Sequence, residues 1–334
     1  MKHEIRILIL MLALIWALAW SAAGRSAAAE GTDAPDEPSP VAAETAERGT
    51  ADAAVRLRVL HGGAVEEMTM DDYLLGVLRA EVPASFEPEA LKAQAIAART
   101  YTYYKMKDGP IPSHPDADAC DSVSCCKAYR TAADAAADWG SMALYWEERL
   151  RRAVAETDGQ VILYDGEPIL AVFFSSANGH TQNAAAVWQS DLPYLQSVSS
   201  PEDETLVPNY YSVVRVSAED LRTAFLAAHP DAALTGDSSR WITDVARNEA
   251  GFVTTLRVGG VSVKGNELRA ILSLRSPSFT VENEDGFFVF RVTGYGHGVG
   301  MSQYGANAMA LRGADAVEIL EHYFTGAQVG AFSA

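Results

Sequence analysis

The sequence predicts an α+β protein in which helices and antiparallel hairpins are mixed. Two observations carry this prediction. Apolar residues recur with the period of a helix in some segments and alternate as in strands elsewhere, and tight turns such as Asp165-Gly166 join the strand-like runs. The two kinds of segment do not alternate one by one, as a parallel α/β sheet would require. We therefore expect an α+β fold around a groove, without internal repeats.

The first half of the folded part is predicted to begin with a strand and to continue with helices. Alternating apolar residues at 55–59 indicate the strand. The aspartates at 71–72 can cap a helix that stops before Pro83. A second helix, with proline at its first position, should cover 88–107, and a third is expected at 147–158.

The second half is predicted to be richer in strands. The clearest hairpin pairs 161–164 with 169–174 through the Asp-Gly turn. A serine followed three residues later by an acidic residue predicts a helix from about 217 to 228. Short strands separated by glycine turns are expected over 241–292, with one short helix at 267–272. The pattern turns helical again from Met301.

The N-terminus is typical of an export segment. Lys2 and Arg6 precede an apolar run at 7–20, and small residues follow at 21–24. A membrane span usually needs about 20 apolar residues. Residues 1–24 are therefore predicted to be either a cleaved signal peptide or an uncleaved membrane anchor, and both alternatives place the rest of the chain outside the cytoplasm.

Residues 25–54 are rich in alanine, acidic residues, proline and threonine and have almost no large apolar side chain. Such a composition cannot bury a core, so it predicts an acidic, disordered linker. The folded domain is expected over residues 55–334. The chain has 334 residues and a formal net charge of −18. This charge argues against nucleic acid as a partner, because phosphate binding needs clustered lysine and arginine.

The segment GYGHGVGMSQYGANAMA at 294–310 is the most informative motif. Glycine at every second position costs backbone entropy, so a folded chain keeps it where backbone passes close to another group or adopts positive φ. Tyr295 and His297 would lie on one side of the extended part, and Gln303 would lie at the start of the following helix. The segment is either a site or a tight corner without chemistry.

Glu81 stands at the end of the first predicted helix among apolar neighbours. Desolvation would raise the pKa of such a carboxyl and suit it to general-acid catalysis. Lys92, Gln94 and Arg99 on the next helix could line the same cleft. The alternative is an ordinary solvated glutamate at a helix end.

A polar loop, Ser175 to Thr181, follows the clear hairpin, and loops at strand ends often hold ligands. Trp188 and Tyr194 offer surfaces on which a sugar ring could stack, or they are packed in the core. A nucleophilic serine is not favoured, because no G-x-S-x-G motif surrounds Ser175.

His114, Cys120, Cys125 and Cys126 supply four metal ligands within one short loop. A Cys₃His set suits structural zinc. The competing interpretation is a disulfide from Cys120 to Cys125 or Cys126, because exported proteins meet oxidising conditions. In either case the loop is predicted to have a structural rather than a catalytic role.

Five segments occur in the order found in one known family. They are YLLGVLRAEVPASFEPEALKAQAIAARTY, the cysteine loop, SSANGHTQ with VWQSDLPYL, VKGNELRAILSLRSPSF and the glycine-rich motif. Together they resemble the stage II sporulation protein D family, the SpoIID/LytB group, from about residue 55 to the C-terminus. The resemblance implies a lytic transglycosylase that cleaves peptidoglycan glycan strands lacking stem peptides, beside a sporulation amidase and the engulfment complex.

The resemblance also implies roles for residues. The catalytic glutamate of the family falls on Glu81, which would protonate the glycosidic oxygen and then accept the proton of the muramyl 6-hydroxyl as the 1,6-anhydro ring closes. No cofactor is expected for this catalysis, and zinc would be structural. Residues expected to bind sugar or stabilise developing charge are Lys92, Arg99, Ser175, Tyr194, His297 and Gln303.

The chain departs from the family's pattern at a few positions. Asn178 replaces a glycine of some relatives, Gln182 replaces a residue that is often acidic, and Cys125 stands where zinc-binding relatives can have histidine. Two other functions stay open: a glycan-binding module that activates an amidase without turnover, and a zinc hydrolase. If the protein acts in sporulation, the resemblance implies the engulfing mother-cell membrane as its location.

Overall fold

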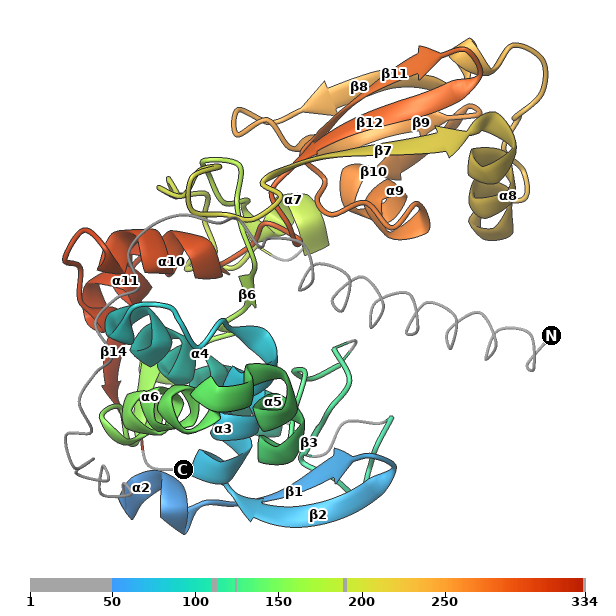
Figure 1. Cartoon of the computed structure of the whole chain (residues 1–334). Coiled ribbons are helices and arrows are strands. Elements are labelled where there is room, and N and C mark those ends of the chain that lie inside the picture. Colours follow the sequence, from blue (N-terminus) through green and yellow to red (C-terminus); the bar gives the residue numbers. More distant parts are fainter. Residues whose placement is uncertain (1–49, 108, 110–112, 124, 189–190, 333–334) are drawn as a thin grey trace. The chain divides into compact units, whose positions relative to one another are not determined.

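The computed structural model describes residues 50–332 apart from 108, 110–112, 124 and 189–190 (Figure 1). By its contacts the chain divides into residues 1–44 and 45–334, and every described element belongs to the second unit. The architecture is the predicted mixture of helices with mainly antiparallel sheets. Two separate hydrophobic cores lie within this unit.

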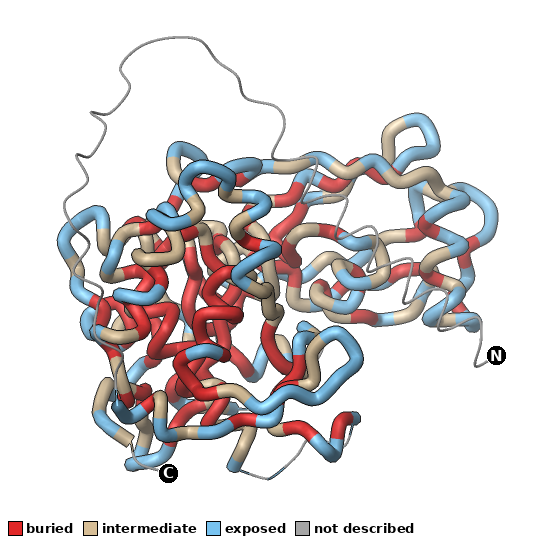
Figure 2. The backbone as a smooth tube through the Cα atoms, turned by 60° about the horizontal axis from the view of Figure 1, so that its bottom comes forward, coloured by how far each residue is buried: buried red, intermediate tan, exposed pale blue. Residues whose placement is uncertain are grey.

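The first core surrounds one central helix. Helix α4 (Pro88–Met106) is buried along almost its whole length, and its many alanines let neighbours approach closely. The helices packed against it are α3 (Met70–Glu81), α6 (Ala143–Ala155), α10 (Gln303–Ala310) and α11 (Ala316–Tyr323). Figure 2 shows this concentration of buried backbone in red.

Two small sheets complete the first core. Strand β1 (Arg56–His61) pairs antiparallel with β2 (Ala64–Thr69) and parallel with β3 (Ala119–Cys120). Strand β4 (Gln160–Tyr164) lies between β5 (Glu167–Pro168) and β14 (Gln328–Ala331), so the end of the chain closes a sheet begun in its middle. Helix α5 (Ala132–Trp139) packs on α6.

The second core lies among two antiparallel sheets and two helices. One sheet has the order β11 (Phe279–Glu284), β12 (Phe287–Thr293), β7 (Tyr211–Ser217), and the other has β10 (Val261–Lys264), β9 (Val253–Val258), β8 (Ile242–Arg247). Helices α8 (Ala218–Ala228) and α9 (Gly265–Ile271) contribute apolar side chains. Phe225, Phe290 and Trp241 are among the buried residues that fill the core.

A short parallel pair brings the two predicted functional loops together. Strand β6 (Phe173–Phe174), which precedes the polar loop, pairs with β13 (Met301–Ser302), which follows the glycine-rich segment. Helix α7 (Ala184–Trp188) comes after the polar loop. The sequence placed β6 in a hairpin with β4, and this expectation is wrong for 173–174, because those residues pair with β13.

Other predicted elements can be compared directly. The helices expected at 88–107 and 217–228 are confirmed, and the Ser217 hydroxyl accepts the N–H of Asp220 at 3.1 Å as a cap. Helix α3 is capped by Thr69 rather than by Asp71 or Asp72. The helix expected at 147–158 is confirmed over 147–155, where it forms the later part of α6, but α6 starts at Ala143 and ends at Ala155.

The boundary of the predicted linker also changes. Residues Thr50–Ala54 form helix α2, and the buried Asp52 bonds to Arg99, so the ordered fold begins before residue 55. The predicted export segment and residues 25–49 lie outside the described residues. Among the described residues, no helix combines the length and apolar character that a membrane crossing needs.

Candidate functional site

Glu81 is the last residue of α3 and is half-buried. The backbone N–H of Ala128 donates to its Oε1 at 2.9 Å. Burial raises the pKa of this carboxyl, and the charge of Lys127 and the Ala128 N–H oppose that rise. The net result is a carboxyl that keeps its proton to higher pH than an ordinary glutamate, as the sequence predicted from its apolar neighbours.

Gln303 joins three helices at this point. Its Nε2 donates to the backbone oxygen of Glu81 at 3.0 Å and to Oε1 of Gln94 at 3.3 Å. Gln303 is the first residue of α10, whose N-cap Ser302 accepts the N–H of Gly305 at 3.2 Å. The glycine-rich motif is therefore in direct contact with Glu81, so Gln303 lies where the sequence expected a site residue.

The glycine-rich segment is held by backbone contacts that side chains would prevent. Gly294 has φ +75°, and a β-carbon there would lie 2.6 Å from the carbonyl oxygen of Ser176. At Gly300, with φ +76°, a β-carbon would overlap the carbonyl oxygen of Val172. Ser176 and Tyr295 exchange backbone hydrogen bonds of 2.9 and 2.8 Å. Both expected reasons for glycine, close approach and positive φ, are confirmed.

His297 is neutral in this environment. Burial, together with the charges of Lys127 and Arg269, lowers its pKa to about 3. Its Nδ1 accepts the N–H of Val299 at 3.1 Å, which leaves the ring proton on Nε2. The ring packs between Phe174 and Trp188, at centroid distances of 5.6 and 5.2 Å. The ring proton interacts with the backbone of Phe173, so His297 is held in place and supplies no positive charge near neutral pH.

Lys127 is a site residue that the sequence reasoning missed. Its Nζ lies 3.7 Å from the ring centroid of Phe173 and 4.1 Å from that of Tyr101. Burial lowers its pKa to about 8, while the charge of Glu81 opposes this effect. Its position directly after Cys126 could have indicated this role, because the backbone that follows a metal ligand is held in one conformation.

Two residues expected to bind substrate are buried in the first core, and for them the expectation is corrected. The Arg99 side chain is 0% exposed and is paired with Asp52 at 2.5 Å. Tyr194 packs on Tyr164, and its hydroxyl accepts the N–H of Leu170 at 3.3 Å. A glycan cannot reach either side chain without opening the core.

Lys92 and Ser175 are more accessible but differ in position. Lys92 pairs with Glu89 at 2.8 Å and with Glu156 at 2.6 Å, so its charge is already balanced. Ser175 is half-buried, and its carbonyl accepts the N–H of Tyr304 at 3.0 Å. The structure thus brings Ser175 to the residue that follows Gln303, whereas Lys92 belongs to a surface ion-pair network.

The polar loop fastens to the glycine-rich segment and to the second core. Gln182 donates from Nε2 to the carbonyl of His297 at 2.9 Å. Asn178 donates from Nδ2 to the carbonyl of Ala250 at 2.7 Å and to Ser278 at 2.8 Å. These neutral amides explain why glutamine and asparagine suit the two positions where the chain departs from its expected pattern.

The four predicted metal ligands converge. One ligand atom from each of His114, Cys120, Cys125 and Cys126 lies within 4.8 Å of all the others. The His114 Nε2 is 3.7 Å from the Sγ of both Cys125 and Cys126. A tetrahedral zinc ion separates its ligand atoms by about 3.5–3.8 Å, which both His114–cysteine distances match, so this donor set suits zinc. His114 also has a carbonyl, that of Ala117, 3.3 Å from Nδ1.

The same geometry does not match the predicted disulfide. The Sγ atoms of Cys120 and Cys125 are 3.0 Å apart, compared with about 2.05 Å in a disulfide. All three cysteines are free. A metal held here would fix the loop whose next residues, Lys127 and Ala128, act on Glu81, so the role of the metal would be structural.

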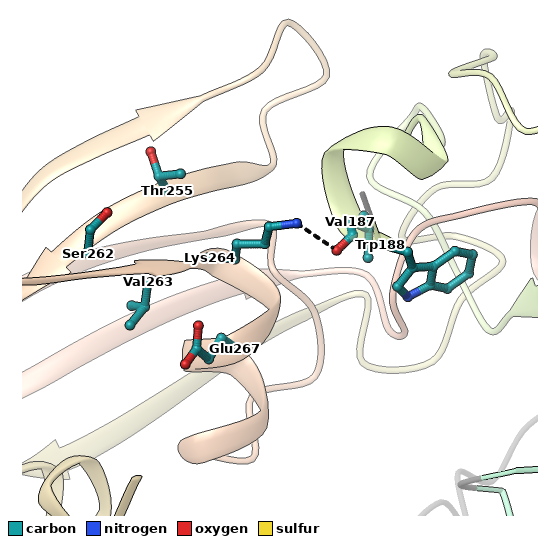
Figure 3. Close-up of a pocket in the computed structure, with 7 residues that line it drawn as sticks. All are labelled: Val187, Trp188, Thr255, Ser262, Val263, Lys264 and Glu267. Atoms are coloured by element: carbon teal, nitrogen blue, oxygen red, sulfur yellow. Dashed lines mark hydrogen bonds between the residues drawn. The ribbon is translucent and has the colours of Figure 1, made fainter. Parts of the chain in front are cut away.

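A pocket of about 390 Å³ lies beside Trp188 (Figure 3). It lies between α7 and the β9–β10–α9 region, where Lys264 donates to the carbonyl of Val187 at 3.0 Å. Trp188, at its margin, is 38% exposed and also packs on His297. Packing was the favoured expectation for Trp188, but the indole has a solvent-facing surface.

The comparisons with known proteins show the family of the chain. The model of a family described as "Stage II sporulation protein" matches residues 61–164, which include Glu81 and the cysteine loop. The chain belongs to the stage II sporulation protein D family. Stage II sporulation protein D of Bacillus amyloliquefaciens is 36% identical over 267 residues, covering 80% of this chain and 75% of that protein.

Two proteins of Bacillus subtilis (strain 168) are also similar. Its stage II sporulation protein D is 35% identical over 270 residues, which cover 80% of this chain and 76% of that protein. Its amidase enhancer is 27% identical over 304 residues, which cover 76% of this chain and 39% of that longer protein.

Proposed function

We propose that the protein is a lytic transglycosylase that cleaves peptide-free peptidoglycan glycan strands and leaves 1,6-anhydromuramyl ends. The observation that carries the proposal is the half-buried Glu81, whose pKa burial raises and whose Oε1 is held by the Ala128 N–H. A carboxyl that keeps its proton in the resting enzyme can donate it to a leaving oxygen.

In the first step the Glu81 carboxyl gives its proton to the glycosidic oxygen, and the bond from that oxygen to C1 of the muramyl ring breaks. In the second step the muramyl O6 bonds to the same C1, and its hydroxyl proton passes to the Glu81 carboxylate. Glu81 is thus restored without water. The nucleophile is part of the substrate, so the enzyme gains from proximity and needs to orient the ring only.

The proposed mechanism uses a single carboxyl. Hydrolytic glycosidases generally use two carboxyl groups about 5–9.5 Å apart. Among the described residues, the charge that acts on the pKa of Glu81 is that of Lys127, which opposes the rise caused by burial. The Lys127 ammonium would favour the Glu81 carboxylate as it forms and lower the barrier to proton transfer.

Other residues would bind the strand. Ser175 can donate a hydrogen bond to a sugar hydroxyl or acetamido group, the neutral His297 ring supports the Trp188 indole that would face a sugar, and Gln303 positions the Glu81 backbone. The pocket beside Trp188 would take a sugar flanking the scissile bond, with the indole as a stacking surface. His114 and the three cysteines would hold a structural zinc ion.

The same proposal includes organisation and location. The export segment at 1–24 would place the chain outside the cytoplasm, either secreted or anchored in a membrane, with the linker as a tether and the rest as one catalytic domain. In an endospore former the enzyme would act at the engulfing mother-cell membrane. Its substrate would come from an amidase that removes stem peptides.

A matched pair of variants tests the proposal. Wild type should release products with 1,6-anhydromuramyl ends from peptide-free strands, measured by mass spectrometry. Glu81→Gln should lower the rate by at least about 100-fold, the usual contribution of a general acid. Glu87→Gln, which changes the N-cap acid of α4, is the control and should retain activity. Reducing-end products from wild type, or full activity of Glu81→Gln, would contradict the proposal.

A second candidate is a glycan-binding module that activates an amidase. The similarity to the amidase enhancer of Bacillus subtilis favours it. The two functions separate in one assay, because Glu81→Gln should still stimulate an amidase if activation depends on glycan binding alone. Stimulation by both proteins with cleavage by neither would replace the enzyme proposal with this one.

A further inference from the structure

Two arginines of the second core stand beside the glycine-rich segment without acidic partners. Arg269 lies on α9 and Arg275 in the loop before β11, and both are half-buried. Neither forms an ion pair with any described residue. The chain has 44 acidic residues and 26 lysines and arginines, so acids are in excess and unpaired arginines are not explained by scarcity.

Backbone and ring contacts hold the pair in place. The Nε of Arg269 donates to the carbonyl of Arg275 at 3.1 Å, and the N–H of Gly296 donates to the same carbonyl at 2.9 Å. The Arg275 guanidinium lies 4.2 Å over the ring of Tyr295. Its Nε is buried and has no hydrogen-bond partner. Such a desolvated cation lacks the anion that would normally compensate its burial.

Hydrogen bonds along the glycine-rich segment connect the arginine pair to Glu81. Tyr295, whose ring lies under the Arg275 guanidinium, exchanges backbone hydrogen bonds with Ser176. The neighbouring Ser175 carbonyl accepts the N–H of Tyr304, and Gln303, one residue before Tyr304, donates to the backbone oxygen of Glu81 at 3.0 Å. The arginines therefore lie on the side of the site that the glycine-rich segment forms.

The chemistry of the glycan supplies a matching anion. A muramyl residue carries a lactyl group on C3 of the ring whose C1 is cleaved. With a stem peptide attached, this lactyl carbonyl is a neutral amide. After the peptide is removed it is a carboxylate, which a guanidinium binds through two charge-assisted hydrogen bonds.

We infer that Arg269 and Arg275 form the receptor for the free lactyl carboxylate of a muramyl residue beside the scissile bond. The pair would thereby select strands that an amidase has already trimmed. This inference rests on the proposed transglycosylase function and adds the group by which the enzyme recognises its substrate. An amide at that position would leave both cations uncompensated and would direct a peptide into the site.

The test measures binding without turnover. Glu81→Gln is titrated calorimetrically with a peptide-free GlcNAc–MurNAc tetrasaccharide, and then with the same tetrasaccharide after its carboxyl groups are converted to N-methylamides. The free acid should bind about 10- to 100-fold more tightly, the range for a hydrogen-bonded charge pair. Equal affinity for the two forms would overturn the inference.

Arginine variants locate the preference. Adding Arg275→Gln to Glu81→Gln should remove most of the preference for the free acid while leaving the affinity for the amide form nearly unchanged. Arg257→Gln, an exposed arginine of β9 paired with Asp244, is the control and should leave the preference intact. An unchanged preference in the folded Arg275→Gln variant would contradict the assignment. Should that variant not fold, Arg275→Lys keeps the charge but loses the fork, and should weaken the preference.

The outcomes also separate the two proposals. Binding of both forms with equal affinity, together with anhydromuramyl products from wild type, rejects the carboxylate receptor and leaves the transglycosylase. Failure of wild type to cleave, with a preference that Arg275→Gln removes, rejects the enzyme and keeps the receptor as part of a glycan-binding module.

Discussion

The cysteine loop and the glycine-rich loop, which bring Ala128 and Gln303 to Glu81, are held in place in different ways. The cysteine loop, residues 114–128, is organised by side chains: four ligand atoms converge within 4.8 Å, and its end places the Ala128 N–H on the carboxyl. The glycine-rich loop, residues 294–302, is organised by backbone contacts with the polar loop. The cysteine loop should therefore be disturbed by the loss of a ligand atom, whereas the glycine-rich loop should be disturbed by an added β-carbon.

The largest expected effect comes from adding a β-carbon to the glycine-rich loop. Gly300→Ala would force the new carbon into the carbonyl of Val172 at a positive φ. We expect a loss of about 3 kcal/mol in the free energy of unfolding, measured by urea denaturation, and at least about 100-fold lower activity.

Gly63→Ala is the matched control for that prediction. Gly63 also has a positive φ, +86°, but nothing lies within 4 Å of a β-carbon placed there. Gly63→Ala should lower the free energy of unfolding by about 1–2 kcal/mol, the cost of a positive φ for a residue with a β-carbon, and should retain activity. Equal losses of stability for the two variants would show that close backbone approach is not what Gly300 provides.

Removing a ligand should affect the cysteine loop. Cys126→Ser is expected to abolish zinc binding, measured by elemental analysis of the purified protein, and to lower activity by about 100-fold, because a displacement of about 1 Å at a catalytic group has that cost. The glycine-rich loop should stay intact in this variant. Removal of zinc from wild type with a chelator should lower activity by the same factor. Full activity of a zinc-free protein would contradict the positioning role.

A smaller effect is expected where the cysteine loop supplies charge. Lys127 lowers the pKa of Glu81, in opposition to burial. Lys127→Met should therefore raise the pKa of Glu81 further and shift the high-pH limb of the rate profile to higher pH, since the acid stays protonated longer. The limb is measured as kcat against pH. A shift to lower pH would mean that Lys127 does not act on Glu81 through its charge.

The smallest effect concerns a residue outside both loops. Lys92 was expected to bind substrate, but it pairs with Glu89 and Glu156 on the surface of α4. Lys92→Ala should lower the free energy of unfolding by about 0.2–1 kcal/mol and leave KM unchanged. A clear rise in KM would restore the original expectation.

These contrasts explain what sequence reasoning could reach. The ligand cluster was predictable because its residues are close in the chain and their chemistry is specific. The reasons for glycine at 294–300 were also accessible, since glycine of this density has few physical causes. Glu81 could be identified from its apolar neighbours and from the family resemblance. Neither predicted that Lys127, Ala128 and Gln303 would surround it.

The remaining errors have a common physical origin. Arg99 was expected to line a cleft because it carries a charge on a predicted helix. Its partner Asp52, 47 residues earlier in the chain, pairs with this charge inside the core. The pairing of β6 with β13 also joins residues that are far apart in the sequence. Long-range partners of this kind leave no local pattern, and the same is true of the contacts of Lys127.

The most direct test of the central claim is the fate of solvent oxygen. Peptide-free strands are digested by wild type in H₂¹⁸O, and the new muramyl ends are weighed by mass spectrometry. The account predicts 1,6-anhydromuramyl ends without ¹⁸O, and their loss in Glu81→Gln, because the ring's own 6-hydroxyl is the nucleophile. Reducing ends that carry ¹⁸O would show that water attacks, and would contradict it.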